Sequence, residues 1–205
     1  MDLLDNAILS AMLVGSFTNS NAIEIVKKKN CLPEDYIISR IDRLIKNGFV
    51  EPDKKTLTDI GRASLRVVLA GGVFDIIHPG HIYTLNSAKS LGNVLIVVVA
   101  TDNTAQKMKN RIPLHNQEQR KKLVNSLSMV DLCLIGYEGD IFKTVEIVRP
   151  EIIALGYDQV HQEKFITDGC SKLNLEVKVA RLQSPNPEIS SSKIEEKYGE
   201  NIHDT

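Results

Sequence analysis

Short apolar runs recur along the last two thirds of the chain, and they constrain its fold more than any other feature. Each run is rich in Val, Ile and Leu, and polar segments with helical spacing lie between the runs. Strands that alternate with helices predict a parallel sheet with right-handed crossovers and helices on both faces. We therefore expect residues 66–205 to form an α/β domain with a doubly wound parallel sheet. Strands are predicted at residues 66–72, 94–100, 131–135, 151–155 and 176–182, and helices near residues 80–91, 117–128, 140–148 and 161–173.

Residues 1–65 predict a smaller domain of another kind. Apolar residues at helical spacing indicate a first helix around 4–12, a second capped by Asn19 or Ser20, and a third that runs from Pro33 to Asn47-Gly48. Residues 49–51 and 56–58 flank a polar tip and suit a two-stranded wing. This pattern, which ends in LTDIGR, resembles winged helix-turn-helix domains.

The charge of residues 1–65 bears on whether this domain binds DNA. It holds nine basic residues, six Lys and three Arg, against nine acidic ones, so its formal net charge is zero. DNA-binding domains usually carry a basic excess, because their affinity depends on neutralising phosphates. The third helix still offers Ser39, Arg40, Arg43 and Lys46 for a local basic face. DNA binding is therefore one expectation, and contact with protein or dimerisation is the other.

The composition predicts a cytoplasmic protein. The three cysteines (Cys31, Cys133 and Cys170) lie far apart, which suits reduced thiols. The N-terminal MDLLDN carries acids where a secretory signal would carry Lys or Arg, so we expect no targeting peptide. The longest apolar run, Val94–Ala100, is far too short to span a bilayer, so we expect no membrane contact.

The stretch GGVFDIIHPGH, residues 71–81, follows directly on the first predicted strand of the α/β domain. Gly71 and Gly72 allow the backbone to approach a ligand closely. His78 and His81 are three residues apart at a predicted helix start, so their side chains point the same way. Imidazoles beside a helix N-terminus, at the carboxyl end of a strand, predict a site for an anion.

Two segments further along the chain add groups that suit phosphates. Residues 107–122 hold six basic residues against the single acid Glu118. Lys121 and Lys122 also fit a simple solvated helix face. Residues 188–194 read EISSSKI, and Ser192 with Glu195 fits a capping box at a helix start, where hydroxyl and N–H groups bind anions.

Taken in order, these three segments resemble the signature of the nucleotidyltransferase superfamily, which includes cytidylyltransferases and adenylyltransferases. That signature, GxFDxxHxGH, is matched at every fixed position, by Gly72, Phe74, Asp75, His78, Gly80 and His81. Class I aminoacyl-tRNA synthetases share only the HxGH part, and their lysine-serine-lysine motif is absent here. The resemblance implies a Rossmann-like nucleotidyltransferase fold in residues 66–205, and domains of this family are commonly dimers.

The resemblance also implies roles for individual residues. The reaction is attack of a phosphate oxygen on the α-phosphorus of ATP or CTP, with release of pyrophosphate. Mg²⁺ or another divalent cation would bridge the phosphates, and no residue is assigned to it. Asp75 would contact substrate or, as we favour, order the glycine turn. The predicted catalytic residues are His78, His81, Lys109 and Arg120, the nucleotide-binding residues are Gly72, Val73, Phe74, Gly80, Ser190, Ser191 and Ser192, and Asp102 is assigned to substrate.

The acceptor is predicted from Gly156, Tyr157, Asp158 and Gln159, which follow the fourth predicted strand of the α/β domain. Glycerol-3-phosphate cytidylyltransferases usually carry a tryptophan in this segment, and the chain has no Trp. The LGYDQ form looks instead like archaeal-type FAD synthetases, which transfer AMP from ATP to FMN. The alternatives are a glycerol-3-phosphate or phosphopantetheine transferase, or a DNA-binding regulator that senses a nucleotide or flavin.

Overall fold

The computed structural model describes residues 1–156, 159, 162–183 and 194. The chain divides into two compact units, Met1–Arg66 and Val67–Thr205. The predictions made for Tyr157, Asp158 and Ser190–Ser192 lie outside the described residues.

A five-stranded parallel sheet forms the centre of the second unit, in the strand order β3-β2-β1-β4-β5. The doubly wound parallel sheet is therefore confirmed. All of its strands fall within the predicted ranges, and the central strands β1 and β2 are nearly continuously apolar because they are covered on both faces. The strands are β1 (Val67–Gly72), β2 (Val94–Val99), β3 (Leu132–Ile135), β4 (Ile152–Leu155) and β5 (Lys178–Arg181).

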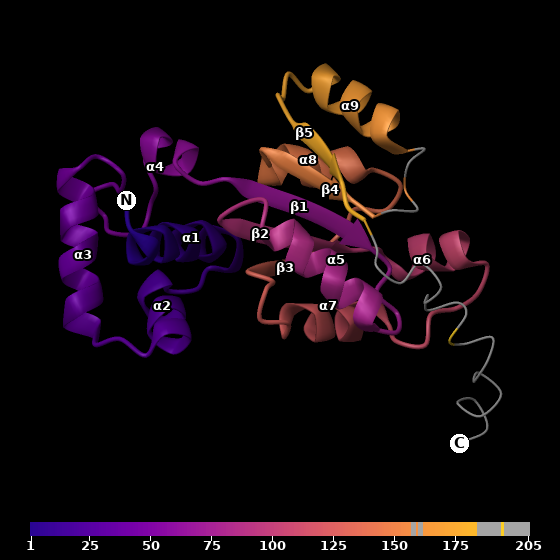
Figure 1. Ribbon diagram of the computed structural model, residues 1–205, viewed down its shortest axis with the longest axis horizontal. Helices are drawn as coiled ribbons and strands as arrows, with labels where there is room; N and C mark the ends of the chain where they lie inside the picture. Colours follow the sequence, from indigo (N-terminus) through magenta and orange to yellow (C-terminus); the bar gives the residue numbers. More distant parts are fainter. Residues whose placement is uncertain (157–158, 160–161, 184–193, 195–205) are drawn as a thin grey trace. The chain divides into compact units, whose positions relative to one another are not determined.

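Helices cover both faces of this sheet (Figure 1). On one face, α5 (Pro79–Lys89) packs against β1 and β2, and α7 (Gln117–Asn125) packs against β2 and β3. On the opposite face lie α8 (Ile141–Val148) and α9 (Glu163–Lys172) (Figure 1). The chain order runs outward from β1 to β3 and then returns to β4 on the other side of β1. The topological switch point therefore lies between β1 and β4, where open α/β sheets bind their ligands.

One helix of the second unit, α6 (Asp102–Lys109), was not predicted from the sequence. Thr101 caps its start, since the hydroxyl accepts from the Thr104 backbone N–H at 3.2 Å. Only Ala105 is buried in it, so the apolar periodicity that reveals a helix is almost absent.

The core of the second unit joins the sheet to α5 and α7. Val68, Leu95 and Val97 are fully buried in the centre of the sheet, and Leu85 of α5 and Val124 of α7 pack against them. This cluster lies directly below the carboxyl ends of β1 and β2, so it supports the segments that leave those strands.

The first unit contains α1 (Leu3–Thr18), α2 (Ala22–Asn30), α3 (Glu34–Lys46) and the short α4 (Asp59–Ala63). α1, α2 and α3 pack against one another, with Ile8, Met12, Ile37 and Ile41 buried. Val50 and Leu57 form an antiparallel bridge where the wing was predicted. The arrangement agrees with the predicted order of helices and hairpin, and its membership of the winged helix-turn-helix class stays a prediction.

The start of the second helix differs from the prediction. Its cap is Asn21, whose side chain accepts from the Ile23 N–H at 2.9 Å. Asn19 instead ends α1, in the left-handed conformation at φ 55°. Asn is among the few residues that adopt the left-handed conformation readily, so it can end a helix as well as cap the start of one.

The basic residues of α3 are largely engaged within the unit. Arg40 and Arg43 donate to the buried Asp5 at 2.7 and 2.8 Å, and Arg40 also pairs with Asp2. The first turn of α3 carries Glu34 and Asp35, which would repel a phosphate backbone. Within the described part of the chain, no helix is long and apolar enough to cross a membrane.

Candidate active site

The site is built on the turn that leaves β1. Phe74 has a φ of 53°, which is uncommon for a residue with a bulky side chain, and its ring folds back over the preceding strand. A Cβ added to Gly72 would lie only 2.9 Å from the Phe74 ring. Glycine is therefore required at position 72 for packing, because any side chain there would displace Phe74.

The two histidines of the signature lie together at the start of α5. His78 is the N-cap residue of α5, and among the described residues no side chain makes a capping hydrogen bond at this helix start. The His78 and His81 rings are 3.9 Å apart between centroids, and the Phe74 ring lies 5.1 Å from that of His81. The Nδ1 atoms of both histidines are buried and make no hydrogen bond to the described protein atoms. Phe74, His81 and His78 therefore form a stack at the positive end of a helix, and its two Nδ1 atoms make no hydrogen bond to the described residues.

Burial and neighbouring positive charge keep both imidazoles neutral. Burial lowers the pKa of His81 to about 4, with further lowering by His78 and Lys109, and a hydrogen bond to the Ile76 backbone acts in the opposite direction. Burial also lowers the pKa of His78, again with a contribution from Lys109. Three cationic or potentially cationic groups thus face one region, and an anion bound there would stabilise all of them.

Asp75, predicted as a substrate or turn residue, is almost fully buried and faces the protein. Its carboxylate accepts from the N–H groups of Leu114 and His115, both at 3.1 Å, and from Arg111 Nη1 at 2.9 Å. Burial alone would raise the pKa of Asp75, but these hydrogen bonds outweigh it and lower the pKa. Asp75 thus orders the backbone of Leu114 and His115 in the structure, and its predicted contact with substrate stays a prediction.

Arg120 is fully buried, with three of its donors engaged. It donates to the carbonyl of Val73 at 2.7 Å, to that of His115 at 2.9 Å and to Asp102 Oδ1 at 2.7 Å. Arg120 thereby joins the end of β1 to the starts of α6 and α7. Its predicted contact with a triphosphate stays a prediction, and so does the substrate role of Asp102, whose carboxylate is engaged with Arg120.

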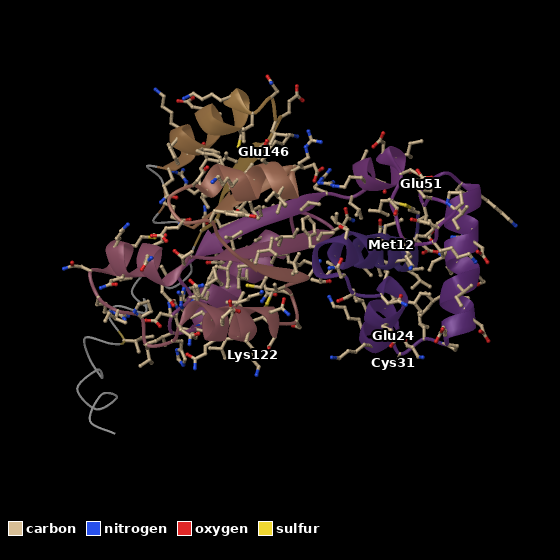
Figure 2. The ribbon with its side chains drawn as sticks, turned by 180° about the vertical axis from the view of Figure 1, so that it is seen from behind. Met12, Glu24, Cys31, Glu51, Lys122 and Glu146 are labelled. Atoms are coloured by element: carbon tan, nitrogen blue, oxygen red, sulfur yellow. The ribbon has the colours of Figure 1, made fainter. Side chains whose placement is uncertain are left out.

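The remaining basic residues of the run 107–122 differ in their surroundings. Lys109 is the one whose charge acts on both histidines. Lys107 lies 4.0 Å from Glu138 and is mostly exposed. Figure 2 shows Lys122 on the outer side of α7, which fits the solvated face considered for it.

On the acceptor side, Gly156 and Gln159 are engaged with each other. The Gly156 N–H donates to Gln159 Oε1 at 2.8 Å, and the Gln159 N–H donates to the Gly156 carbonyl at 3.1 Å. The Gln159 side chain therefore closes the turn after β4. A direct substrate contact of either residue stays a prediction.

A cavity of about 820 Å³ adjoins His78. The described residues that line it come from the start and outer face of α5: Ile77, His78, Pro79, Ile82, Tyr83, Asn86, Ser87 and Ser90. A smaller polar hollow of about 420 Å³ lies beside α6, lined by Asn103, Gln106, Lys107, Asn110 and Glu138.

Three residues that tie the site together were not predicted from the sequence. Arg111 and His115 hold Asp75, and the Gln117 side chain accepts from the Asp102 N–H at 3.0 Å. Arg111 was visible as part of the basic run. His115 acts mainly through its backbone, which carries no sequence signal.

The described residues do not form a site for a divalent cation by themselves. They contain no group of three or more His, Cys, Asp or Glu side chains that could hold a metal ion. The nearby carboxylates, Asp75 and Asp102, are engaged with arginines, and a hard cation such as Mg²⁺ prefers oxygen ligands to imidazole. Phosphate oxygens of a nucleotide would have to supply most of the ligands.

Comparison with known proteins agrees with this geometry. The chain is 49% identical over 125 residues to a protein of Picrophilus torridus named FAD synthase, covering 61% of this chain and 89% of that one. It is 43% identical over 138 residues to FAD synthase of Thermoplasma volcanium, covering 65% and 96% of the two chains.

A solved structure and a family profile complete the comparison. The crystal structure of the lipopolysaccharide core biosynthesis protein from Thermoplasma volcanium GSS1 matches with a TM-score of 0.56 and 43% identity, over 58% of this chain and 98% of that chain. The profile of the cytidylyltransferase-like family matches residues 69–197. Because that match spans more than half of the residues of this chain, the chain belongs to the cytidylyltransferase-like family.

Proposed function

We propose that this protein is an FMN adenylyltransferase, which transfers AMP from ATP to FMN and gives FAD and pyrophosphate. The observation that carries the proposal is the 49% identity to a protein named FAD synthase, of which the match covers 89%. The paired histidines at the switch point of the sheet support it, since they suit a phosphate-transfer site.

The reaction needs little general-base catalysis. The phosphate monoester of FMN is already anionic, so one of its oxygens attacks the α-phosphorus of ATP directly. A new P–O–P bond forms, and the bond from the α-phosphorus to the oxygen that bridges it to the β-phosphorus breaks. That oxygen leaves with pyrophosphate. Catalysis then consists mainly of positioning and charge stabilisation.

In this proposal His78, His81 and Lys109 stabilise the negative charge of the phosphates. The histidines are neutral in the free protein, and the approach of a polyanion favours their protonated forms. The N-terminus of α5 adds its positive end at the same place. Ser190, Ser191 and Ser192 are proposed to hold the distal phosphates, and Tyr157 and Asp158 to contact the acceptor. A divalent cation, when bound by the phosphates, neutralises part of their charge.

The acceptor and the base of the nucleotide are tested by one screen. The protein is incubated with Mg²⁺ and each pairing of ATP or CTP with FMN, glycerol-3-phosphate or phosphopantetheine, and pyrophosphate release is followed. We expect release with ATP and FMN. Release with CTP and glycerol-3-phosphate alone would contradict the proposed acceptor and support the cytidylyltransferase alternative.

For the first unit we propose contact with protein, including a second copy of the chain, rather than with DNA. The support is that Arg40 and Arg43 of α3 are engaged with Asp2 and Asp5. A homodimer and a cytoplasmic location are part of this proposal. Sedimentation at several concentrations tests the dimer, and a purely monomeric protein would contradict it.

A further inference from the structure

The loop between α6 and α7, residues 110–116, is attached to the end of β1 by the buried carboxylate of Asp75 and, through the His115 carbonyl, by Arg120. Asp75 accepts hydrogen bonds from three different residues of this loop, namely Arg111, Leu114 and His115. The Asp75 carbonyl lies a further 3.1 Å from His115 Nδ1. The loop has no regular secondary structure between α6 and α7, so these contacts, together with the hydrogen bond from Arg120 to the His115 carbonyl, hold it in place.

The hydrogen bonds that the Asp75 carboxylate accepts have the strength expected when the acceptor is ionised. The Asp75 side chain is 1% exposed, its carboxylate oxygens accept from backbone and guanidinium donors, and its pKa is lowered. Hydrogen bonds to a carboxylate are about twice as strong as those between neutral groups. Removing the charge would weaken every hydrogen bond that the loop donates to the Asp75 carboxylate.

The loop begins next to Lys109. Lys109 is the last residue of α6, Asn110 follows in the left-handed conformation at φ 54°, and Arg111 comes next. The guanidinium of Arg111 and the backbone N–H groups of Leu114 and His115 are all bound to Asp75, and this limits how far the last residue of α6 can move away from the end of β1. The Lys109 charge, in turn, acts on both His78 and His81.

We propose that Asp75 is a positioning residue, which holds the loop 110–116 through Arg111 so that Lys109 faces the histidine pair when a nucleoside triphosphate binds. The proposal rests on the proposed function only in requiring a triphosphate as ligand, and it holds for any acceptor. It also explains why a carboxylate is useful inside the turn of the signature without any contact to substrate.

A double-mutant cycle tests this proposal. The affinity for ATP in the presence of Mg²⁺ is measured by calorimetry, without FMN, for the wild type, D75N, K109M and the double variant. We expect D75N and K109M each to weaken binding by about tenfold or more. We expect the double variant to bind no more weakly than K109M alone, because D75N acts through the lysine.

Asp131 supplies a matched control. This carboxylate is also partly buried, pairs with Lys89 and accepts from the Leu95 N–H at 2.8 Å, at the opposite end of the strands. D131N should lower the melting temperature and leave the coupling between ATP binding and Lys109 unchanged. If D75N behaves like D131N, or if the effects of D75N and K109M multiply, the positioning role is wrong.

A second variant covers the case in which D75N does not fold. R111Q removes the ion pair and leaves the backbone hydrogen bonds of Asp75 in place, and the same cycle is run with K109M. Failure of the proposed function gives a different result, namely normal ATP binding without FAD formation. If the wild type binds only CTP, the cycle is measured with CTP, and binding of neither nucleotide contradicts both proposals.

Discussion

At the scale of single residues, the signature segment is shaped by packing as much as by chemistry. Phe74 adopts a positive φ, covers Gly72 and contacts His81, which stacks on His78. Each member fixes the next, so the imidazoles have defined positions although their Nδ1 atoms lack hydrogen bonds to the described protein. Gly72 thus makes room for the Phe74 ring, which contacts His81, and the predicted contact of Gly72 and Phe74 with the nucleotide stays a prediction.

Replacement of Gly72 by Ala tests this stack. The added methyl group would lie 2.9 Å from the Phe74 ring, so Phe74 must move, and we expect a loss of about 1–3 kcal/mol in the free energy of unfolding together with reduced turnover. Gly71→Ala is the matched control, since its Cβ would lie 3.7 Å from the Val98 carbonyl, an ordinary contact. Equal effects of the two substitutions on turnover would contradict the role of the stack.

The low pKa of His81 predicts a pH dependence of stability. Burial holds the pKa of the folded state at about 4, whereas the unfolded value is 6.5, so the unfolded chain binds more protons between these values. His81 therefore lowers stability progressively as the pH falls from about 6.5 to 4, by on the order of 3 kcal/mol. Urea unfolding of the wild type and of H81N at pH 7 and pH 4.5 measures the difference. An identical pH dependence of the two proteins would show that His81 titrates normally.

At the scale of elements, the site depends on how α6, α7 and the end of β1 are joined. Arg120 of α7 donates to Asp102, the first residue of α6, and to the carbonyl of Val73, which follows β1. It therefore connects these three elements. An arginine suits this place because its planar group offers donors in several fixed directions at once. The elements that carry Lys109 and the histidines are thereby fixed relative to one another.

Replacement of Arg120 by Lys separates a bracing role from direct contact with phosphate. Lysine cannot reach Val73, His115 and Asp102 together, so we expect a loss of about 3–5 kcal/mol in the free energy of unfolding. Lys122→Ala on the outer face of α7 is the control and should change stability by less than about 0.5 kcal/mol. If R120K keeps its stability and loses only turnover, the direct contact is supported instead.

The elements also show what the sequence predicts well. The strands were predicted because buried parallel strands are nearly continuously apolar, as in Val94–Val99. α6 was missed because it is short and polar, and α4 because it has only 5 residues. The burial of Arg120 could not be predicted, since its acceptors come from segments far apart in the chain and are mostly backbone carbonyls. His78 and His81 were found because their spacing and place after a strand are visible in sequence alone.

At the scale of the whole molecule, the chain joins two compact units, and the family match lies within the second. The first unit has equal numbers of acidic and basic residues through residue 65, and the arginines of α3 are engaged with acids. These features favour protein contact over nucleic acid.

Binding to labelled duplex DNA tests the role of the first unit. We expect that the affinity for DNA does not rise when the salt concentration is lowered from about 200 to about 50 mM, because few phosphates would be neutralised. A steep dependence of affinity on salt, abolished by reversing the charge of Lys46 and Lys55, would establish DNA contact and contradict the proposal.

The central claim, AMP transfer to FMN, is tested most directly by identifying the product. The protein is incubated with ATP, FMN and Mg²⁺, and FAD and pyrophosphate are quantified by chromatography and a coupled assay. We predict that FAD and pyrophosphate form in equal amounts, and that H81A slows both by at least about a hundredfold while the fold is retained. Absence of FAD from a folded wild-type protein that binds ATP, or an unchanged rate in H81A, would contradict this account.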